Sequence, residues 1–238
     1  MKRIISALAI FLLFPLTAHA DSHIDVWGGF GRKDNVYSCI ATEEKIVALT
    51  FDDGPHPRYT DEILDILAKY GARATFFVIG KNAESYPEKL KRIAAEGHEI
   101  GNHTYSHVTA GKVSEGDFRR ELEKTHDIIK RLTGVSPVLF RPPTGYCDAA
   151  TVRSAARLNY KIIVWNVDTK DWMHTGAENI ISSVSTSARG GCIVLFHDYV
   201  SAPSPTPKAL SVLIPSLMRS GYRFVTVSEL ISLDARKS

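Results

Sequence analysis

The chain has 238 residues, 44% hydrophobic and 23% charged, a composition typical of a globular protein that can bury a full core. Its formal net charge of +3 falls to +1 when the two charges of Lys2 and Arg3, near the N-terminus, are left out. That balance gives no argument for a nucleic acid or an anionic membrane as partner, and the length fits one large α/β domain or two small ones.

The first twenty residues, MKRIISALAIFLLFPLTAHA, have the pattern of a secretory signal peptide. A basic start precedes an apolar run from Ile4 to Leu16, and the stretch ends in the small-x-small sequence Ala18-His19-Ala20. A membrane anchor is the alternative, but the run is short for a bilayer crossing, which needs about 20 residues. We predict cleavage after Ala20, export to the periplasm or the extracellular space, and no stable membrane insertion afterwards.

Residues 21–44 have no clear period and predict an irregular lead-in. From Lys45 onward, short β-rich runs alternate with segments of helical spacing. Strands are expected at 45–51, 74–79, 98–101, 139–140, 161–167, 192–196 and 222–227. Helices are expected at 60–70, with Thr60 as N-cap, and at 87–96, 118–132, 148–158, 177–188 and 208–218. The alternation predicts one α/β domain over 45–230, a mainly parallel sheet covered by helices as a barrel or a doubly wound sheet, and a tail at 231–238.

The cysteines are few, and their odd number leaves at least one thiol unpaired. Cys192 opens an apolar run, which favours a buried thiol. A disulfide between Cys39 and Cys147 stays open on the sequence alone.

Polar residues gather just after the predicted strands. Asp52 and Asp53 follow the first strand, and later strands are followed by His103 and His107, by Arg141, by Asp168 and Asp171, and by His197. Because the carboxyl ends of strands in a β/α barrel meet on one face, this placement predicts a single site.

His103-Thr-Tyr-Ser-His107 offers two imidazoles at i and i+4, on one face if the segment is helical, a spacing that suits one metal ion. The segment lacks the internal glutamate of HExxH metalloproteases, so an acidic ligand and a base must come from elsewhere. The Asp52–Asp53 pair can supply both, because Gly54-Pro55 ends the strand and lets both carboxylates turn toward one pocket. A cation there would remove their repulsion.

TFDDGP (50–55), HTYSH (103–107), RPPTGY (141–146), DTKDW (168–172) and LFH (195–197) occur in this order. Together they resemble the polysaccharide deacetylase family, the NodB-homology or carbohydrate esterase family 4 domain, over roughly 45–230. The resemblance implies a distorted (β/α) barrel. It also implies metal-dependent removal of N-acetyl groups from N-acetylglucosamine residues of a glycan, with peptidoglycan or chitooligosaccharide favoured.

The resemblance also implies roles for individual residues. The metal ligands would be Asp53, His103 and His107, holding Zn²⁺, with Co²⁺ or Ni²⁺ as alternatives. Asp52 would be the general base, paired with Arg141, and Asp171 would orient His197, the general acid. The substrate would meet the backbone N–H of Tyr146, as oxyanion donor, and an apolar wall made by Trp172 and Leu195.

Two other functions stay open on the sequence. One is an acetyl-ester deacetylase acting on a substrate such as acetylxylan, since the same water attack cleaves an ester. The other is a catalytically silent carbohydrate-binding barrel. Asp168 is assigned no catalytic role, and His56, His98, His126 and His174 belong to no motif and are expected to be structural or at the surface. Protein partners are not indicated by any pattern.

Overall fold

The computed structural model describes residues 32–200 and 203–234. The leader expected at residues 1–20 lies outside them, so it stays a prediction, as do the outer domain boundaries. Within the described residues, no helix combines the length and the apolar character that a bilayer crossing requires.

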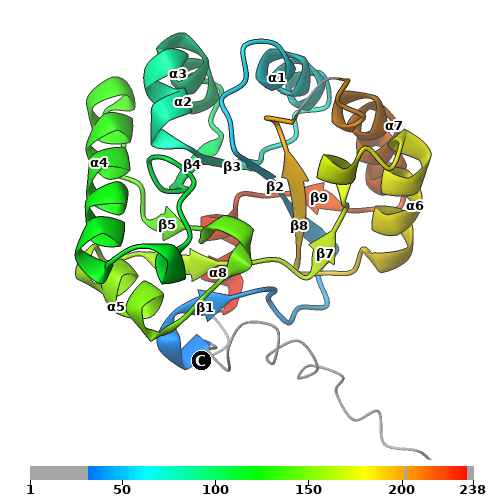
Figure 1. The fold of residues 1–238 in the computed structure, drawn as a ribbon. Coiled ribbons are helices and arrows are strands. Elements are labelled where there is room, and N and C mark those ends of the chain that lie inside the picture. The colour runs from blue at the N-terminus through cyan, green and yellow to red at the C-terminus, as the bar shows by residue number, and fades with distance from the viewer. Residues whose placement is uncertain (1–31, 201–202, 235–238) are drawn as a thin grey trace, which may run out of the picture.

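In the part of the chain that the structure describes, a sheet of nine strands forms the centre, and each pairing between these strands is parallel. Figure 1 shows its arrangement. The strands are β1 (Val36–Tyr37), β2 (Ile46–Asp52), β3 (Thr75–Val78), β4 (Glu99–Asn102), β5 (Leu139–Phe140), β6 (Lys161–Ile163), β7 (Val167–Asp168), β8 (Cys192–His197) and β9 (Arg223–Phe224). Their order is β1-β6-β5-β4-β3-β2-β8-β7, and β9 pairs with β2. The sheet is curled with β1 and β7 at its ends, which confirms the distorted barrel.

Helices surround this sheet (Figure 1). They are α1 (Tyr59–Lys69), α2 (Gly80–Ser85), α3 (Pro87–Ala95), α4 (Glu115–Thr133), α5 (Ala149–Arg157), α6 (Ala177–Ser187) and α7 (Thr206–Arg219). Single 3₁₀ turns lie at η2 (Arg32–Asp34), η3 (Ala110–Lys112), η4 (Pro143–Gly145) and η5 (Asp171–Met173). The short α2 was not expected from the sequence, and α1 does not begin on a Thr60 cap, because Thr60 lies inside the helix.

The alternation of side chains along β2 explains how the barrel is filled. Val47, Leu49 and Phe51 belong to the large core between the sheet and the outer helices. Ile46 and Ala48 point the other way, into a second core inside the barrel. This period of two carries over to Asp52, which therefore lies on the inner face at the end of the strand.

An additional helix, α8 (Val227–Asp234), fills the inside of the barrel at the end where the strands begin. The strand that the sequence predicted at 222–227 is shorter in the structure, since β9 spans two residues, and α8 continues past residue 230, where the sequence predicted the start of a tail. A capping box starts the helix, since the Thr226 N–H donates to Glu229 Oε2 at 2.9 Å and the Glu229 N–H to Thr226 Oγ1 at 3.3 Å. Its Val227 N–H donates to Thr75 Oγ1 on β3 at 3.0 Å.

Substitution of Leu230 tests whether α8 is a structural plug. Leu230 is fully buried in the inner core, so Leu230→Ala should lower the free energy of unfolding by about 2–5 kcal/mol. The matched change Ser232→Ala, on the exposed side of the same helix, should change it by less than about 0.5 kcal/mol. Urea denaturation measures both, and equal effects would show that α8 does not close the barrel.

The strand expected at 161–167 is two strands at opposite ends of the sheet. β6 pairs with β1 and β5, whereas β7 pairs with β8. Between them the Val164 N–H donates to the Tyr37 carbonyl at 2.9 Å and the Asn166 N–H to the Ile193 carbonyl at 3.2 Å. Residues 164–166 therefore carry the chain across the opening of the barrel, and most of the apolar KIIVWNV run is buried on both sides of this crossing.

The lead-in is also more ordered than predicted, because β1 lies within it. Cys39 faces Cys192 across an antiparallel bridge rather than lying beside Cys147, and all three thiols are free.

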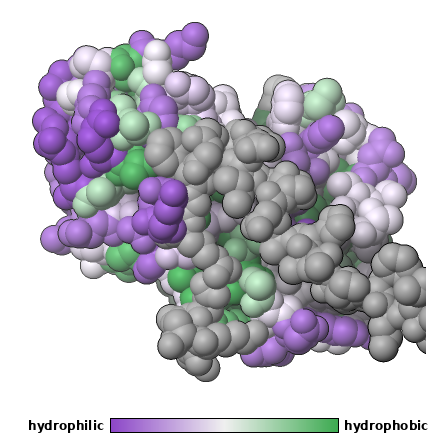
Figure 2. Space-filling model, turned by 90° about the horizontal axis from the view of Figure 1, so that it is seen from below, coloured by the Kyte–Doolittle hydropathy of each residue, from purple (hydrophilic) through white to green (hydrophobic). Residues whose placement is uncertain are grey.

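Figure 2 views the molecule from below, where hydrophilic side chains occupy both sides of the face and hydrophobic ones lie nearer its middle.

Candidate active site

Asp52 and Asp53, at the carboxyl end of β2, direct their carboxylates toward the same site at the end of the barrel. Asp52 is the last residue of β2, and its register partner on β8 is His197. Parallel register partners point to the same face, so the Asp52 and His197 side chains share the inner side of the sheet. Asp53 has a φ of 76°, in the left-handed region that aspartate tolerates, and this turns the second carboxylate toward the first.

Asp53, His103 and His107 come together. Asp53 Oδ1 lies 3.4 Å from His103 Nε2 and 3.3 Å from His107 Nε2. One ligand atom from each of the three residues lies within 4.8 Å of the other two. The His103–His107 segment is a loop and not a helix, because Thr104 and His107 both have positive φ angles of 65° and 60°. The imidazoles converge through this loop geometry instead of the i, i+4 helical spacing that the sequence suggested.

The hydrogen bonds of His103 indicate what belongs between these atoms. His103 Nδ1 lies 2.7 Å from the Arg141 carbonyl oxygen, which only accepts, so Nδ1 carries the proton. His103 Nε2 faces Asp53 Oδ1, a buried oxygen that accepts no hydrogen bond, and the charges of Asp52 and Asp53 outweigh burial and raise the pKa of His103. The negative charge of the carboxylates therefore favours a cation here, either a proton on Nε2 or a metal ion, and one carboxylate with two imidazoles is a donor set that suits a divalent metal.

Arg141 holds the neighbouring carboxylate. Its Nη1 donates to Asp52 Oδ1 at 2.7 Å and to Thr50 Oγ1 at 2.8 Å, while Nε and Nη2 donate to the Ile163 and Val164 carbonyls at 3.3 Å. The guanidinium is fully buried and Asp52 is 3% exposed, so the charges compensate each other in a water-poor interior. Because its carbonyl also fixes His103, Arg141 organises both the carboxylate and the imidazole.

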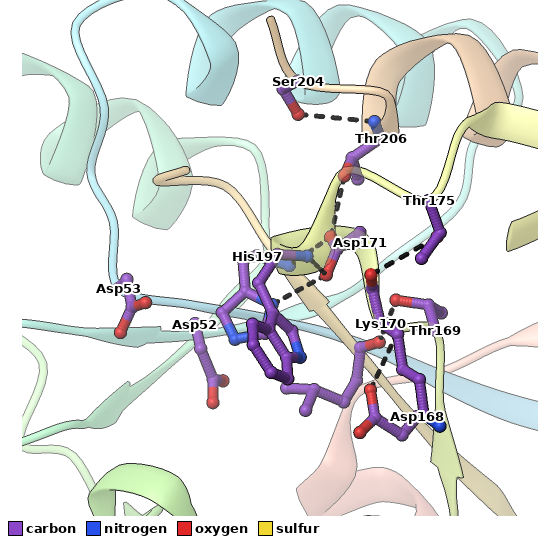
Figure 3. Close-up of polar contacts among 12 residues, drawn as sticks. Asp52, Asp53, Asp168, Thr169, Lys170, Asp171, Thr175, His197, Ser204 and Thr206 are labelled. Atoms are coloured by element: carbon purple, nitrogen blue, oxygen red, sulfur yellow. Dashed lines mark hydrogen bonds and ion pairs between the residues drawn. The ribbon is translucent and has the colours of Figure 1, made fainter. Parts of the chain in front are cut away.

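Asp171 fixes His197 on the other side of the centre (Figure 3). Its Oδ1 lies 2.8 Å from His197 Nδ1, and its Oδ2 accepts the His197 N–H at 2.8 Å and the Thr206 hydroxyl at 2.7 Å. The carboxylate is fully buried. His197 Nε2 is thereby left for another partner, and Figure 3 shows Asp52 and Asp53 on the side of His197 away from Asp171.

The three residues expected to meet the substrate differ in their surroundings. Leu195 is 3% exposed on β8 and, two residues before His197, points to the same side of the sheet. Trp172 follows Asp171 directly and is 51% exposed. Tyr146 is 46% exposed, and its N–H donates to the Pro143 carbonyl at 3.3 Å, a long hydrogen bond for which another acceptor can compete.

Two further residues complete the hydrogen-bond networks and were not singled out from the sequence. Thr50 lies two residues before Asp52, so the period of two along β2 could have placed it on the same face. Thr206 begins α7, far along the chain from Asp171, and no local pattern connects them. Asp168 lies outside both networks, and its Oδ1 accepts the Lys170 N–H at 2.8 Å.

Comparison with known proteins matches this arrangement to one family. The family model described as polysaccharide deacetylase matches residues 40–163. A peptidoglycan-N-acetylglucosamine deacetylase of Bacillus cereus is 41% identical over 81% of this chain and 91% of its own length. A crystal structure of the Bc1960 peptidoglycan N-acetylglucosamine deacetylase has a TM-score of 0.81 at 39% identity, covering 84% of this chain and 94% of the other. A family 4 acetyl xylan esterase from Clostridium thermocellum, solved with a cobalt ion, has a TM-score of 0.74 at 38% identity, with 79% and 91% covered.

Proposed function

The chain belongs to the polysaccharide deacetylase family and is a hydrolase of the carbon–nitrogen bond in N-acetyl groups, and we propose that its substrate is the N-acetylglucosamine of peptidoglycan or of chitooligosaccharides. The observation that carries the proposal is the convergence of Asp53, His103 and His107 beside two ionic pairs, the buried Asp52–Arg141 and the partly buried Asp171–His197. Such an arrangement would provide a metal site flanked by one base and one acid.

Asp53, His103 and His107 would hold the metal, with Zn²⁺ as the proposed ion and Co²⁺ or Ni²⁺ as alternatives. A divalent ion supplies Lewis acidity to a carbonyl oxygen and to water. The residues around it prepare the ligands: the Arg141 carbonyl keeps the His103 ring in the tautomer that binds through Nε2. The cobalt ion in the acetyl xylan esterase structure supports a divalent metal at this fold.

Asp52 would remove a proton from the attacking water. Arg141 occupies its Oδ1, so Oδ2, which lies 3.7 Å from His103 Nε2, faces the metal ligands and is left to accept the proton. The water oxygen then bonds to the acetyl carbon, and the oxyanion would be held by the Tyr146 N–H, a kind of contact that contributes about 3 kcal/mol. Leu195 and Trp172 would receive the acetyl methyl group.

His197 would complete the reaction as the general acid. Its Nδ1 is tied to Asp171, so Nε2 donates the proton to the amide nitrogen as the carbon–nitrogen bond breaks. Acetate and a free amine on the sugar are the products. Without that proton, the tetrahedral intermediate would expel the water oxygen again and return to substrate.

Released acetate tests the proposal. The metal-loaded protein should release acetate from peptidoglycan and from chitooligosaccharides, and mass spectrometry of the products should show the loss of acetyl groups from N-acetylglucosamine. Chelation of the metal should stop the release, and added Zn²⁺ should restore it. The absence of acetate from every glycan with metal bound would contradict the proposal and favour a silent carbohydrate-binding barrel.

An acetyl-ester substrate is a second candidate, because the acetyl xylan esterase shares the fold at 38% identity. Acetylxylan belongs in the same assay for this reason. Faster release from acetylxylan than from chitooligosaccharides at equal concentrations of acetyl groups would favour the esterase. The signal-peptide pattern at residues 1–20 and a glycan of the cell envelope as substrate both favour an exported protein, in the periplasm or outside the cell.

The pH dependence of kcat/KM should report the ionisation of His197, which Asp171 holds. Burial alone would lower the pKa of His197, but the hydrogen bond and charge of Asp171, with two nearby carboxylates, raise this pKa to about 9. A general acid works when protonated, so kcat/KM should fall as the pH rises through that pKa, and a bound cation should move the fall to somewhat lower pH.

Asp171→Asn removes the charge that raises the pKa of His197. The alkaline fall of kcat/KM should therefore begin at least about one pH unit lower than in the wild type. Asp168→Asn is a matched control at the end of a neighbouring strand and should leave the profile in place. An unshifted profile in Asp171→Asn would mean that His197 is not the acid.

A further inference from the structure

Exposed aromatic side chains gather at the end of the barrel that carries the active site. Among residues 32–200 and 203–234, the tyrosines and tryptophans that are exposed are Tyr146, Trp172 and Tyr199, at 46%, 51% and 37%. All three follow the carboxyl end of a strand: Tyr146 after β5, Trp172 after β7 and Tyr199 after β8. Tyr199 has no part in the reaction described above.

Tyr199 belongs to a group of three rings that we name the His56 platform, consisting of His56, Tyr59 and Tyr199. The His56 ring stacks on Tyr59, with centroids 4.6 Å apart and an interplanar angle of 19°. It meets Tyr199 nearly at a right angle, with centroids 4.7 Å apart and an angle of 77°. A perpendicular contact covers at most one face of a ring, so His56 leaves at least one face of Tyr199 uncovered.

The backbone fixes the His56 ring in this position. His56 Nδ1 accepts the N–H groups of Arg58 and Tyr59, both at 3.0 Å, at the start of α1. The His56 N–H donates to Thr60 Oγ1 at 2.7 Å. Since Nδ1 is an acceptor, the ring is neutral, in keeping with burial, which lowers the pKa of His56. Tyr199 therefore packs against a partner that is already ordered and uncharged.

The platform is continuous with the active site. His56 follows Asp53 by three residues, and Tyr199 follows His197 by two. Asp198, between His197 and Tyr199, ties the two loops together: its N–H donates to the Asp52 carbonyl at 3.2 Å and its Oδ2 accepts the Thr60 hydroxyl at 2.5 Å. Tyr199 therefore lies in the loop that directly follows His197, at the same end of the barrel as the metal ligands.

A sugar ring has the chemistry that such a surface recognises. The face of a pyranose carries C–H bonds with partial positive charge, which are attracted to the negative face of an aromatic ring, while its hydroxyl groups stay in water at the rim. A glycan polymer places further sugar rings beside the one that reacts. A fixed aromatic face next to the reacting centre would hold one of them at little cost in side-chain entropy, because the ring is ordered before binding.

We propose that Tyr199, supported by His56 and Tyr59, is a stacking subsite for a sugar ring adjacent to the N-acetylglucosamine that loses its acetyl group. This inference rests on the proposed function, since it assigns a second binding position on the same glycan. It makes Tyr199 a determinant of the preference for longer chains.

Affinity for an oligomer tests the subsite without turnover. Binding of the N-acetylglucosamine hexamer is measured by isothermal titration calorimetry with metal-loaded Asp52→Asn protein, in which cleavage should be blocked. Adding Tyr199→Ala should raise the Kd about tenfold, the equivalent of about one aromatic contact. Tyr199→Phe keeps the ring and should stay within about twofold, as should Met218→Ala, an exposed side chain near the end of α7 away from this rim.

Kinetics on active protein provide the second readout. Tyr199→Ala should lower kcat/KM more for the hexamer than for the dimer, mainly through KM. An unchanged Kd in Tyr199→Ala, or an equal loss in Tyr199→Phe, would overturn the subsite. If the wild type releases no acetate at all, the proposed function fails instead, and the calorimetric comparison still decides whether Tyr199 binds sugar.

Discussion

Replacement of Asp52 by asparagine is expected to lower kcat by at least about 10²-fold and up to about 10⁴-fold while the metal stays bound. Asparagine has nearly the same shape but cannot accept the proton of the attacking water. The metal ligands, Asp53 and the two histidines, are unchanged in this variant. Turnover is measured by acetate release, and metal content by inductively coupled plasma mass spectrometry on the same sample.

The variant should also be less stable, because the buried Arg141 guanidinium loses its counter-charge. Removal of one partner from a buried pair costs about 3–5 kcal/mol. Thermal unfolding followed by circular dichroism therefore accompanies the kinetics, and the rate is measured well below the midpoint of unfolding. Nearly full activity of a folded, metal-loaded Asp52→Asn protein would show that Asp52 is not the base.

Removal of a ligand should abolish metal binding and turnover together. Asp53→Ala takes away the carboxylate that both imidazoles face, and His107→Ala takes away one of the imidazoles. Each substitution should lower the metal affinity by more than about 100-fold, because loss of a residue that only supports a ligand already lowers the affinity by about 10–100-fold. Competition with a chromogenic chelator measures the affinity.

Asp168→Ala serves as the matched control for these ligand variants. It also removes an aspartate at the carboxyl end of a strand, but one whose Oδ1 accepts a backbone N–H beside it and lies outside both networks of the site. It should keep its metal and its rate. If Asp53→Ala bound metal as tightly as this control, the ion would have to be held by other residues.

Much of the site could be predicted because barrel topology converts distance along the chain into proximity. Residues after β2, β4, β5, β7 and β8 are separated by tens of positions, yet parallel strands deliver them to the same edge. The period of two along β2 likewise separates Phe51, which packs against the outer helices, from Asp52, which faces inward.

The local backbone of the site could not be predicted in the same way. Asp53, Thr104 and His107 all have positive φ angles, a conformation that non-glycine residues adopt only when the surrounding structure imposes it. The helical spacing of His103 and His107 was therefore misleading, although their convergence was expected. The sequence carries no signal for this strain.

Long-range packing explains why the sequence did not predict α8 or the contact between Thr206 and Asp171. Val227 is apolar and ends a β-rich run, so it extended the predicted strand, but the structure starts a helix there that packs inside the curled sheet. Thr206 meets Asp171 because α7 begins beside η5. Contacts of this kind depend on how complete elements pack, and no window of the sequence contains both partners.

Anomalous diffraction at the zinc absorption edge, from crystals of the active, Zn²⁺-loaded protein, tests the central claim most directly. We expect one strong peak within bonding distance of Asp53 Oδ1 and of Nε2 of both His103 and His107, with the Asp52 carboxylate beside it and still paired with Arg141. Fully active protein without a peak at these three residues, or with its metal bound elsewhere, would contradict the account.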